Sequence, residues 1–140
     1  MAKNKYEAIF CDLGNVLINF DHRIAVKKIL QLTPKSETDI YQLFFDSGVT
    51  KDYEEGKISS RDFFKKVKDS LGLNIDYNKF LPIWNDIFFE TPLNKKIQAF
   101  LKEVKEKYKL VMISNINEPH WKFLKNKIPV FGEFDKLILS

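Results

Sequence analysis

The sequence of 140 residues predicts an α/β protein with a parallel sheet and a helical domain inserted after the first strand. An almost wholly apolar segment, residues 6–11, is typical of a strand buried on both faces. Residues 21–89 then carry helical periodicity over a stretch too long for a simple crossover, and after residue 90 helical and strand patterns alternate. Strands that alternate with helices favour a parallel sheet with right-handed crossovers.

The inserted stretch divides into several amphipathic helices. Asp21 is suited to cap the first helix, which places Ala25, Ile29 and Leu32 on one stripe. Further helices are expected from Ser36, between Gly48 and Gly56, from Ser59 or Ser60 to Gly72, and from Asp76. We therefore divide the chain into a core domain of residues 1–20 and 90–140 and a helical domain of residues 21–89.

The second part of the core domain begins with the clearest amphipathic helix of the chain. Thr91 is a capping residue, Pro92 suits the first helical position, and the apolar residues at 93, 97, 100, 101, 104 and 108 share one face. A buried strand over residues 110–113 follows and ends in the polar pair Ser114 and Asn115. A helix from Asn117 and a short strand over residues 134–139 complete the pattern.

Composition and charge narrow the classes of partner. The net charge of +4 is distributed over lysines that alternate with acids, as in residues 102–107, which describes a solvated helix face rather than a nucleic-acid site. No apolar run is long enough to span a bilayer, and the N-terminus has no secretory apolar region. The single cysteine, Cys11, cannot form an internal disulfide and is expected to be a core residue of a cytoplasmic protein. We expect neither nucleic acid nor membrane as a partner.

The most informative position is Asp12, which directly follows the first strand. The carboxyl ends of parallel strands are where open α/β sheets bind ligands. A carboxylate at that edge can act as a covalent nucleophile, as a metal ligand, or as both. An aspartate after a strand can also serve only as a helix cap or turn former.

Residues 12–17 read Asp-Leu-Gly-Asn-Val-Leu and resemble motif I of the haloacid dehalogenase-like (HAD) hydrolases, whose usual form is Asp-x-Asp-Gly-Thr/Val-Leu. Residues 45–48 and 53–59 are similar to the cap of a phosphatase-type branch of that superfamily, and residues 111–115 resemble its motif II. The resemblance covers essentially the whole chain. It implies a Rossmann-like core, with the helical domain as a cap that gates access to the site.

The resemblance also implies roles for matching residues. Asp12 would be the nucleophile that forms an aspartyl-phosphate, and Asp12 with the backbone carbonyl of Gly14 would hold Mg²⁺. Ser114 would donate a hydrogen bond to a phosphoryl oxygen, and Asn115 would contact substrate or serve a turn. The implied activity is a magnesium-dependent phosphatase acting on a small phosphorylated metabolite.

Two departures from the family pattern qualify this interpretation. Gly14 stands where the family has a second aspartate, the general acid and base, and a glycine cannot transfer a proton. An ester with a readily leaving alcohol, such as an anomeric sugar phosphate, would suffer less from this loss, and water or a cap residue could also supply the proton. The family's motif III lysine and motif IV acids are expected beyond Ser140, so the core is expected to be incomplete at its C-terminus. The resulting uncovered sheet edge favours self-association.

These departures leave two alternatives open. One is a catalytically silent or truncated scaffold with a binding or regulatory role. The other is a haloacid dehalogenase, which needs no acid at position 14 but usually carries an aromatic residue there. Among the remaining polar side chains, His22 is expected to be exposed, Trp121 to pack in the core, and His120 has no assigned role.

Overall fold

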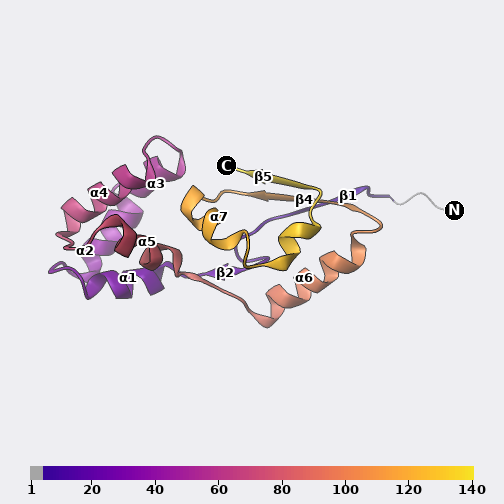
Figure 1. The fold of residues 1–140 in the computed structure, drawn as a ribbon, viewed down its shortest axis with the longest axis horizontal. Helices are drawn as coiled ribbons and strands as arrows, with labels where there is room; N and C mark the ends of the chain where they lie inside the picture. Colours follow the sequence, from indigo (N-terminus) through magenta and orange to yellow (C-terminus); the bar gives the residue numbers. More distant parts are fainter. Residues whose placement is uncertain (1–4) are drawn as a thin grey trace. The chain divides into compact units, whose positions relative to one another are not determined.

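The computed structural model describes residues 5–140, which form two compact units. The first unit, here called the core unit, contains residues 5–20 and 88–140. The second, the helical unit, is Asp21–Ile87. Both are drawn in Figure 1, and each is considered by itself.

Three parallel strands form the sheet of the core unit. They are β1 (Ala8–Cys11), β4 (Lys109–Ser114) and β5 (Lys136–Leu139), with β4 in the centre. In this register Cys11 pairs with Met112, and Ser114 pairs with Leu139. The predicted α/β class with a parallel sheet is confirmed, and the strand order agrees with consecutive crossovers in one direction.

Both long helices of the core unit lie on the same side of this sheet (Figure 1). They are α6 (Pro92–Val104) and α7 (Glu118–Leu124), followed by the 3-10 helix η2 (Pro129–Glu133). Two right-handed crossovers that progress in one direction along a sheet place both connecting helices on one face. Their apolar side chains, with those of one sheet face and the loop after β1, form the hydrophobic core of this unit: Leu13, Leu17, Ile18, Leu101, Leu110, Met112, Leu124, Ile128, Val130 and Phe131.

The opposite face of the sheet is open, which corrects the expectation that the first strand is buried on both faces. Phe10 is 64% exposed, and Ile113 and Ile138 on the neighbouring strands are 45% and 41% exposed. Met112, which points to the other face, is fully buried. The apolar runs predict the strands themselves, but an apolar run does not tell which faces of a strand are covered.

A two-stranded antiparallel ribbon lies where the chain leaves and re-enters the core unit. It pairs β2 (Asn19–Phe20) with β3 (Phe88–Phe89), with Asn19 opposite Phe89 and Phe20 opposite Phe88. The helical pattern predicts residues 88 and 89 in the helical domain, whereas the ribbon makes them part of the core unit. Strands of two residues carry no detectable alternation, so nothing in the sequence marked them.

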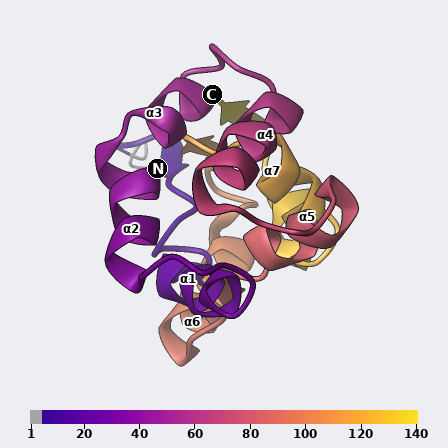
Figure 2. The ribbon, with the colours of Figure 1, turned by 90° about the vertical axis from the view of Figure 1, so that its left-hand side faces the viewer.

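The helical unit is capped as its sequence predicts. Side chains of Asp21, Ser36, Ser59 and Asp76 each accept a hydrogen bond from a backbone N–H of the helix that follows, and Gly72 ends a helix with φ of 63°. A π-helix, η1, continues α2 directly. The elements are α1 (His22–Leu30), α2 (Glu37–Tyr41), η1 (Gln42–Asp46), α3 (Val49–Glu54), α4 (Ser60–Leu71) and α5 (Tyr77–Asn85). Figure 2 labels the α-helices among them.

An aromatic cluster forms the centre of the helical unit. Phe63 is 1% exposed and stacks on Tyr53 with 4.5 Å between ring centroids. Trp84 packs against Phe63 at 5.0 Å and against Phe44 at 5.3 Å. The helical unit therefore has a hydrophobic core of its own, built from α4, α5 and the helices that precede them.

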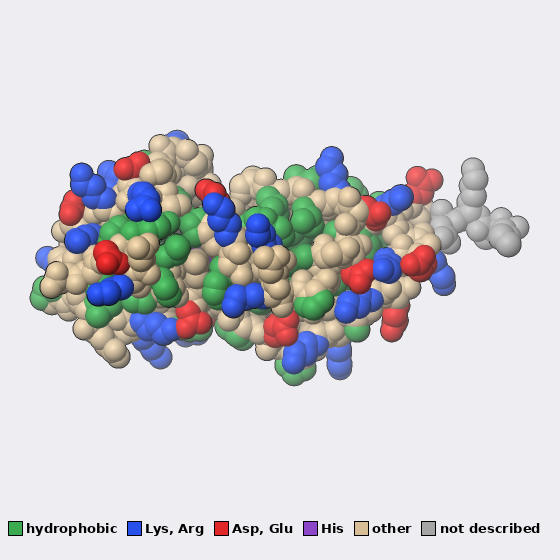
Figure 3. Space-filling model, in the orientation of Figure 1, with side chains coloured by type: hydrophobic (Ala, Val, Ile, Leu, Met, Phe, Trp, Pro, Cys, Tyr) green, Lys and Arg blue, Asp and Glu red, His purple; other side chains and the backbone are tan. Residues whose placement is uncertain are grey.

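The surface is mixed in charge. Figure 3 shows lysine and arginine side chains interspersed with acidic ones over the visible face of the molecule. Within residues 5–140, no helix combines the length and the apolar character that a membrane span requires.

Because one face of the sheet is buried and the other is open, substitutions at neighbouring positions of β4 should differ in their effect on the free energy of unfolding. Met112→Ala empties a fully buried site and is expected to lower the free energy of unfolding by about 2–4 kcal/mol, whereas Ile113→Ala on the open face should cost less than about 1 kcal/mol. Urea unfolding in a Trp84→Phe background, where Trp121 is the remaining tryptophan, measures both changes in the core unit. Equal costs would mean that the open face is covered in solution.

Candidate active site

Asp12 lies directly after β1, at the carboxyl end of the sheet, with its side chain exposed. The backbone N–H of Leu13 donates a hydrogen bond of 2.6 Å to Asp12 Oδ1. This bond fixes the direction of the carboxylate relative to the backbone. The second carboxylate oxygen remains accessible to a ligand, because the side chain faces solvent.

A tight turn follows Asp12. The Leu13 carbonyl accepts a hydrogen bond of 2.9 Å from the N–H of Leu17, and the Ile18 carbonyl accepts one of 2.7 Å from the N–H of Asn15. Asn15 has φ of 60°, in the left-handed region that asparagine tolerates better than most residues. Leu13, Leu17 and Ile18 are all buried, so the turn is held on the sheet by its apolar side chains as well as by its hydrogen bonds.

Gly14 is required by space rather than by backbone conformation. A Cβ atom at this position would lie 2.8 Å from Cε1 of Phe20, closer than van der Waals contact allows. The ring of Phe20 therefore occupies the volume into which a side chain at position 14 would project. The sequence revealed the missing acid, whereas the structure supplies the steric reason for it.

Ser114 and Asn115 reach the same edge of the sheet from β4. Continuing the register of Cys11 with Met112, Asp12 is level with Ile113, and Ser114 follows one residue further on the neighbouring strand. Neighbouring strands are about 4.8 Å apart. The backbone positions of three predicted site residues are thus close, although Ser114 is only 7% exposed and its side chain belongs to the helix-covered face.

Asn115 is tied to the end of β5. The hydroxyl of Ser140 donates to Asn115 Oδ1, and the N–H of Ser140 donates a 3.0 Å hydrogen bond to the carbonyl of Ser114. The side chain of Asn115 is exposed, and its NH₂ group is a donor of the kind that a phosphoryl oxygen accepts. Its hydrogen bond to Ser140 also fits the turn role that the sequence left open.

The donors near Asp12 suit a magnesium ion. Mg²⁺ prefers oxygen ligands and commonly binds through one or two carboxylates, substrate phosphate and several waters. Within residues 5–140 the hydrogen bonds of the turn use the carbonyls of Leu13 and Ile18 rather than that of Gly14. No group of three or more His, Cys, Asp or Glu side chains in the described part of the chain could enclose a metal. The Asp12 carboxylate and the Gly14 carbonyl, which the sequence predicted as ligands, are thus oxygen groups of the kind that Mg²⁺ accepts.

Cys11 precedes Asp12 and is half-buried. Burial, with a smaller contribution from the Asp12 charge, raises the pKa of its thiol to about 11. Its Sγ lies 3.2 Å from the carbonyl of Asp12, to which it donates. The side chain is thus a neutral thiol at physiological pH, as expected for a core residue.

Two residues of α6 that the sequence analysis did not single out hold the turn in place. Asn94, which is 1% exposed, donates hydrogen bonds to the carbonyl of Val16 and to Asn19 Oδ1. Gln98 donates a 2.8 Å hydrogen bond to the carbonyl of Leu17. The sequence signalled only a helix start at Thr91, because an asparagine or glutamine on a helix has no pattern that reveals its distant acceptor.

The structure shows the environments of both histidines, His22 and His120. His22 was expected to be exposed, which is wrong: it is half-buried against the rings of Phe45 and Trp84, and burial lowers its pKa. His120 is buried beside Phe88. The backbone N–H of His120 donates to Asn117 Oδ1. The NH₂ group of Asn117 therefore faces His120 Nδ1, at 3.0 Å, and donates to it. The proton of the His120 ring consequently lies on Nε2.

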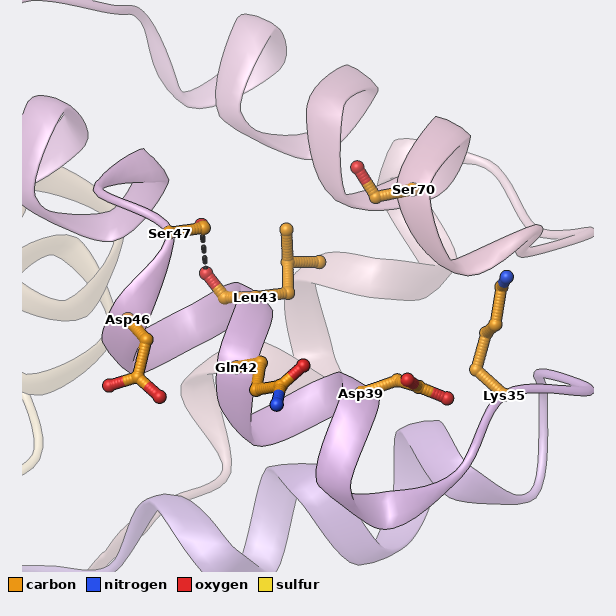
Figure 4. Close-up of a pocket in the computed structure, with 7 residues that line it drawn as sticks. All are labelled: Lys35, Asp39, Gln42, Leu43, Asp46, Ser47 and Ser70. Atoms are coloured by element: carbon orange, nitrogen blue, oxygen red, sulfur yellow. Dashed lines mark hydrogen bonds between the residues drawn. The ribbon is translucent and has the colours of Figure 1, made fainter.

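A surface depression of about 440 Å³ lies in the helical unit (Figure 4). The hydroxyl of Ser47 donates to the carbonyl of Leu43 in its wall. None of the predicted site residues contributes to it. Its lining residues are Lys35, Asp39, Gln42, Leu43, Asp46, Ser47 and Ser70.

Comparison with known proteins finds one curated phosphatase and several solved structures of HAD family enzymes that are similar to this chain, while no protein-family model matches it. The chain is 26% identical to a D-ribitol-5-phosphate phosphatase of Bacteroides thetaiotaomicron, over 100% of this chain and 68% of that protein. The crystal structure of the HAD family enzyme bt-2542 from the same species superposes with a TM-score of 0.82 at 25% identity, covering 98% of this chain and 70% of that one. Its wild-type complex with magnesium and inorganic phosphate gives a TM-score of 0.78 at 26% identity, over 96% and 69% of the two chains.

The contact between positions 14 and 20 predicts a coupled stability effect. Gly14→Ala is expected to cost about 1–3 kcal/mol of unfolding free energy because the new methyl group overlaps the ring of Phe20. A Phe20→Leu background should remove much of that cost, which a double-mutant cycle measures.

Gly132→Ala is the matched control for this cycle. Its Cβ would meet no atom within 4 Å, and it lies in the same unit, so the alanine there should be tolerated in both backgrounds. Additive effects of Gly14→Ala and Phe20→Leu would contradict the steric explanation.

Proposed function

We propose that this chain belongs to the haloacid dehalogenase-like superfamily of hydrolases and carries the nucleophile of a magnesium-dependent phosphatase for a small phosphorylated metabolite. The observation that carries the proposal is the exposed carboxylate of Asp12 at the carboxyl end of β1, fixed by the N–H of Leu13. Ligands bind at this edge in open α/β sheets.

In the proposed reaction Asp12 attacks phosphorus. A bond forms between a carboxylate oxygen and phosphorus, the bond from phosphorus to the ester oxygen breaks, and the alcohol leaves. Water then attacks the same phosphorus, inorganic phosphate leaves, and the free carboxylate is restored. The 2.6 Å hydrogen bond from Leu13 keeps the carboxylate in one orientation through both steps.

Other groups at the carboxyl end of the sheet are proposed to bind the metal ion and the negatively charged phosphoryl group. Asp12 and the Gly14 carbonyl would hold Mg²⁺, which when bound stabilises negative charge on the transferring phosphoryl group. The hydroxyl of Ser114 and the NH₂ group of Asn115 would donate to its oxygens. The proximity of β1 and β4 in the sheet supports this assignment.

Residue 14 cannot supply the leaving-group proton, because it is a glycine, and a side chain there would meet the ring of Phe20. The alcohol therefore takes its proton from water or from the helical unit, or leaves as a stable anion. Esters with readily leaving alcohols, such as anomeric sugar phosphates, are therefore the favoured substrates. The helical unit, residues 21–87, is proposed as the cap that selects among them.

Two other functions remain to be separated from this one. One is a catalytically silent scaffold. It is favoured by the proposed metal site, which has one carboxylate, since residues 5–140 contain no group of three or more metal-binding side chains. A haloacid dehalogenase is favoured by the ring of Phe20, which brings an aromatic group into the space of a residue 14 side chain. Chloride release from a haloacid, without phosphate release from any ester, would support the dehalogenase.

The direct test of the phosphatase uses a panel of phosphomonoesters with Mg²⁺ and with chelator. Asp12→Asn is expected to lower kcat by at least about 10³-fold because the amide cannot form the covalent intermediate. Ser114→Ala is expected to lower it by about 10²-fold through the loss of a donor to the phosphoryl group.

Glu103→Gln, which changes an exposed carboxylate of α6 in the core unit, serves as the control and should leave turnover unchanged. Magnesium-dependent turnover that survives Asp12→Asn would eliminate Asp12 as the nucleophile. Absence of turnover in the unsubstituted chain, with phosphate still bound, would favour the silent scaffold.

We also propose that a polypeptide of these 140 residues self-associates through the uncovered edge and open face of its sheet. Parallel sheets normally have both faces covered, yet Phe10 and Ile113 are exposed here. Phe10→Lys with Ile113→Lys is expected to shift sedimentation from dimer to monomer. Leu93→Lys, which is 63% exposed on α6, is the control, and an equal shift with it would contradict the assignment.

We propose the cytoplasm as the compartment in which this protein acts. Cys11 is the single cysteine of the chain and is a free thiol. A reducing compartment keeps such a thiol unmodified.

A further inference from the structure

We propose that Asn94 and Gln98 are positioning residues that fix the turn after Asp12 and thereby the ligands it offers to metal and substrate. Both belong to α6, which follows the helical unit in the chain, more than 70 residues after the turn. The structural part of this inference stands by itself, and its catalytic consequence rests on the proposed function.

Asn94 uses all of its hydrogen-bonding capacity. Its Oδ1 accepts from the N–H and from the hydroxyl of Thr91, each at 2.8 Å. Its Nδ2 donates to the carbonyl of Val16 at 2.9 Å and to Asn19 Oδ1 at 3.0 Å. A carboxamide has two donors and two acceptor sites, so this side chain is fully satisfied where it is buried.

The orientation of this amide follows from its partners. A backbone N–H can only donate, so the atom that faces the N–H of Thr91 must be the oxygen. The NH₂ group of Asn94 consequently points at the turn. Capping α6 needs only the oxygen, because a capping box works through an acceptor at this helix position. The two donors of Asn94 serve the turn and not the helix.

Gln98 extends the same contact by one helical turn. Residues four apart lie on one face of a helix, and Gln98 Nε2 donates to the carbonyl of Leu17 at 2.8 Å. Its second acceptor, Glu90 Oε1, lies at 3.3 Å. Two adjacent carbonyls of the turn, those of Val16 and Leu17, are thus each held by an amide from α6.

These bonds determine where the ligands of the proposed site lie. The turn is fixed at its start by β1 and at its end by the amides of Asn94 and Gln98, so the carbonyl of Gly14 between them has little freedom. A displacement of about 1 Å in a catalytic group can cost about 10²-fold in rate. Loss of either amide should therefore affect metal binding and turnover more than it affects the fold.

The test compares three variants of the whole chain. Asn94→Asp keeps the acceptor that caps α6 but replaces both donors with an oxygen that repels the carbonyl of Val16. Gln98→Met keeps the length of the half-buried side chain and removes its donor. Asp135→Ala is the matched control, because it removes the acceptor of the 2.8 Å bond from the Leu110 N–H at the opposite end of the sheet.

Two measurements separate the rigidity of the turn from the rate of the reaction. Amide hydrogen exchange of Asn15 and Leu17, whose N–H groups bond within the turn, is expected to be at least about 10-fold faster in Asn94→Asp and Gln98→Met than in Asp135→Ala. With p-nitrophenyl phosphate, the Mg²⁺ concentration for half-maximal rate should rise, or kcat fall, by at least about 10-fold in the same two variants, at unchanged KM.

The outcomes distinguish this inference from the proposed function. Exchange in the turn equal to that of Asp135→Ala would overturn the inference, and so would a loosened turn with unchanged Mg²⁺ dependence and kcat. A loosened turn in a chain whose unsubstituted form has no phosphatase activity would support the structural role and overturn the proposed function. Should Asn94→Asp fail to fold, Gln98→Met decides by the same readouts.

Discussion

The structure depends on the turn that reverses the chain directly after β1. Leu13, Leu17 and Ile18 place their side chains in the core of the unit, while Asp12 immediately before them stays exposed. Apolar burial of this size is worth several kcal/mol, and it is available only when the backbone turns within these few residues. The exposed position of the carboxylate is thus maintained by the burial of the residues that follow it.

The two faces of the sheet in the core unit differ in burial. The face covered by α6 and α7 contains the buried side chains, among them Met112, whereas the other face presents Phe10 and Ile113 to solvent. Right-handed crossovers in one direction lead to this arrangement without any further interaction. The helical unit has its own aromatic core around Phe63 and contributes no buried side chain to this cluster.

The sequence predicted those elements whose signal is local and repeated. The pattern at 93, 97, 100, 101, 104 and 108 predicted α6, and Asp21, Ser36 and Thr91 cap helices as expected. It did not predict the ribbon of β2 and β3, the exposure of Phe10, or the half-buried state of His22. These features depend on which segments meet in space, which periodicity does not encode.

The same limit applies to the candidate site. Asp12, Ser114 and Asn115 were found because they follow strands, and the sheet brings their backbones to one edge. The contact between Gly14 and Phe20 and the bonds of Asn94 to the turn have no sequence signature, since each is set by the distance between two atoms.

Asn94 shows why a buried polar side chain can matter for conformation more than for stability. Its four hydrogen bonds replace bonds to water, so their net stabilisation is small, but breaking any of them leaves a buried group unsatisfied at a cost of about 1–3 kcal/mol. An apolar residue would fill the same space and tolerate many conformations of the turn. Asparagine tolerates only the one in which the carbonyl of Val16 and the side chain of Asn19 face it. The helix that closes the core unit after the helical insertion thereby selects the backbone geometry directly after Asp12.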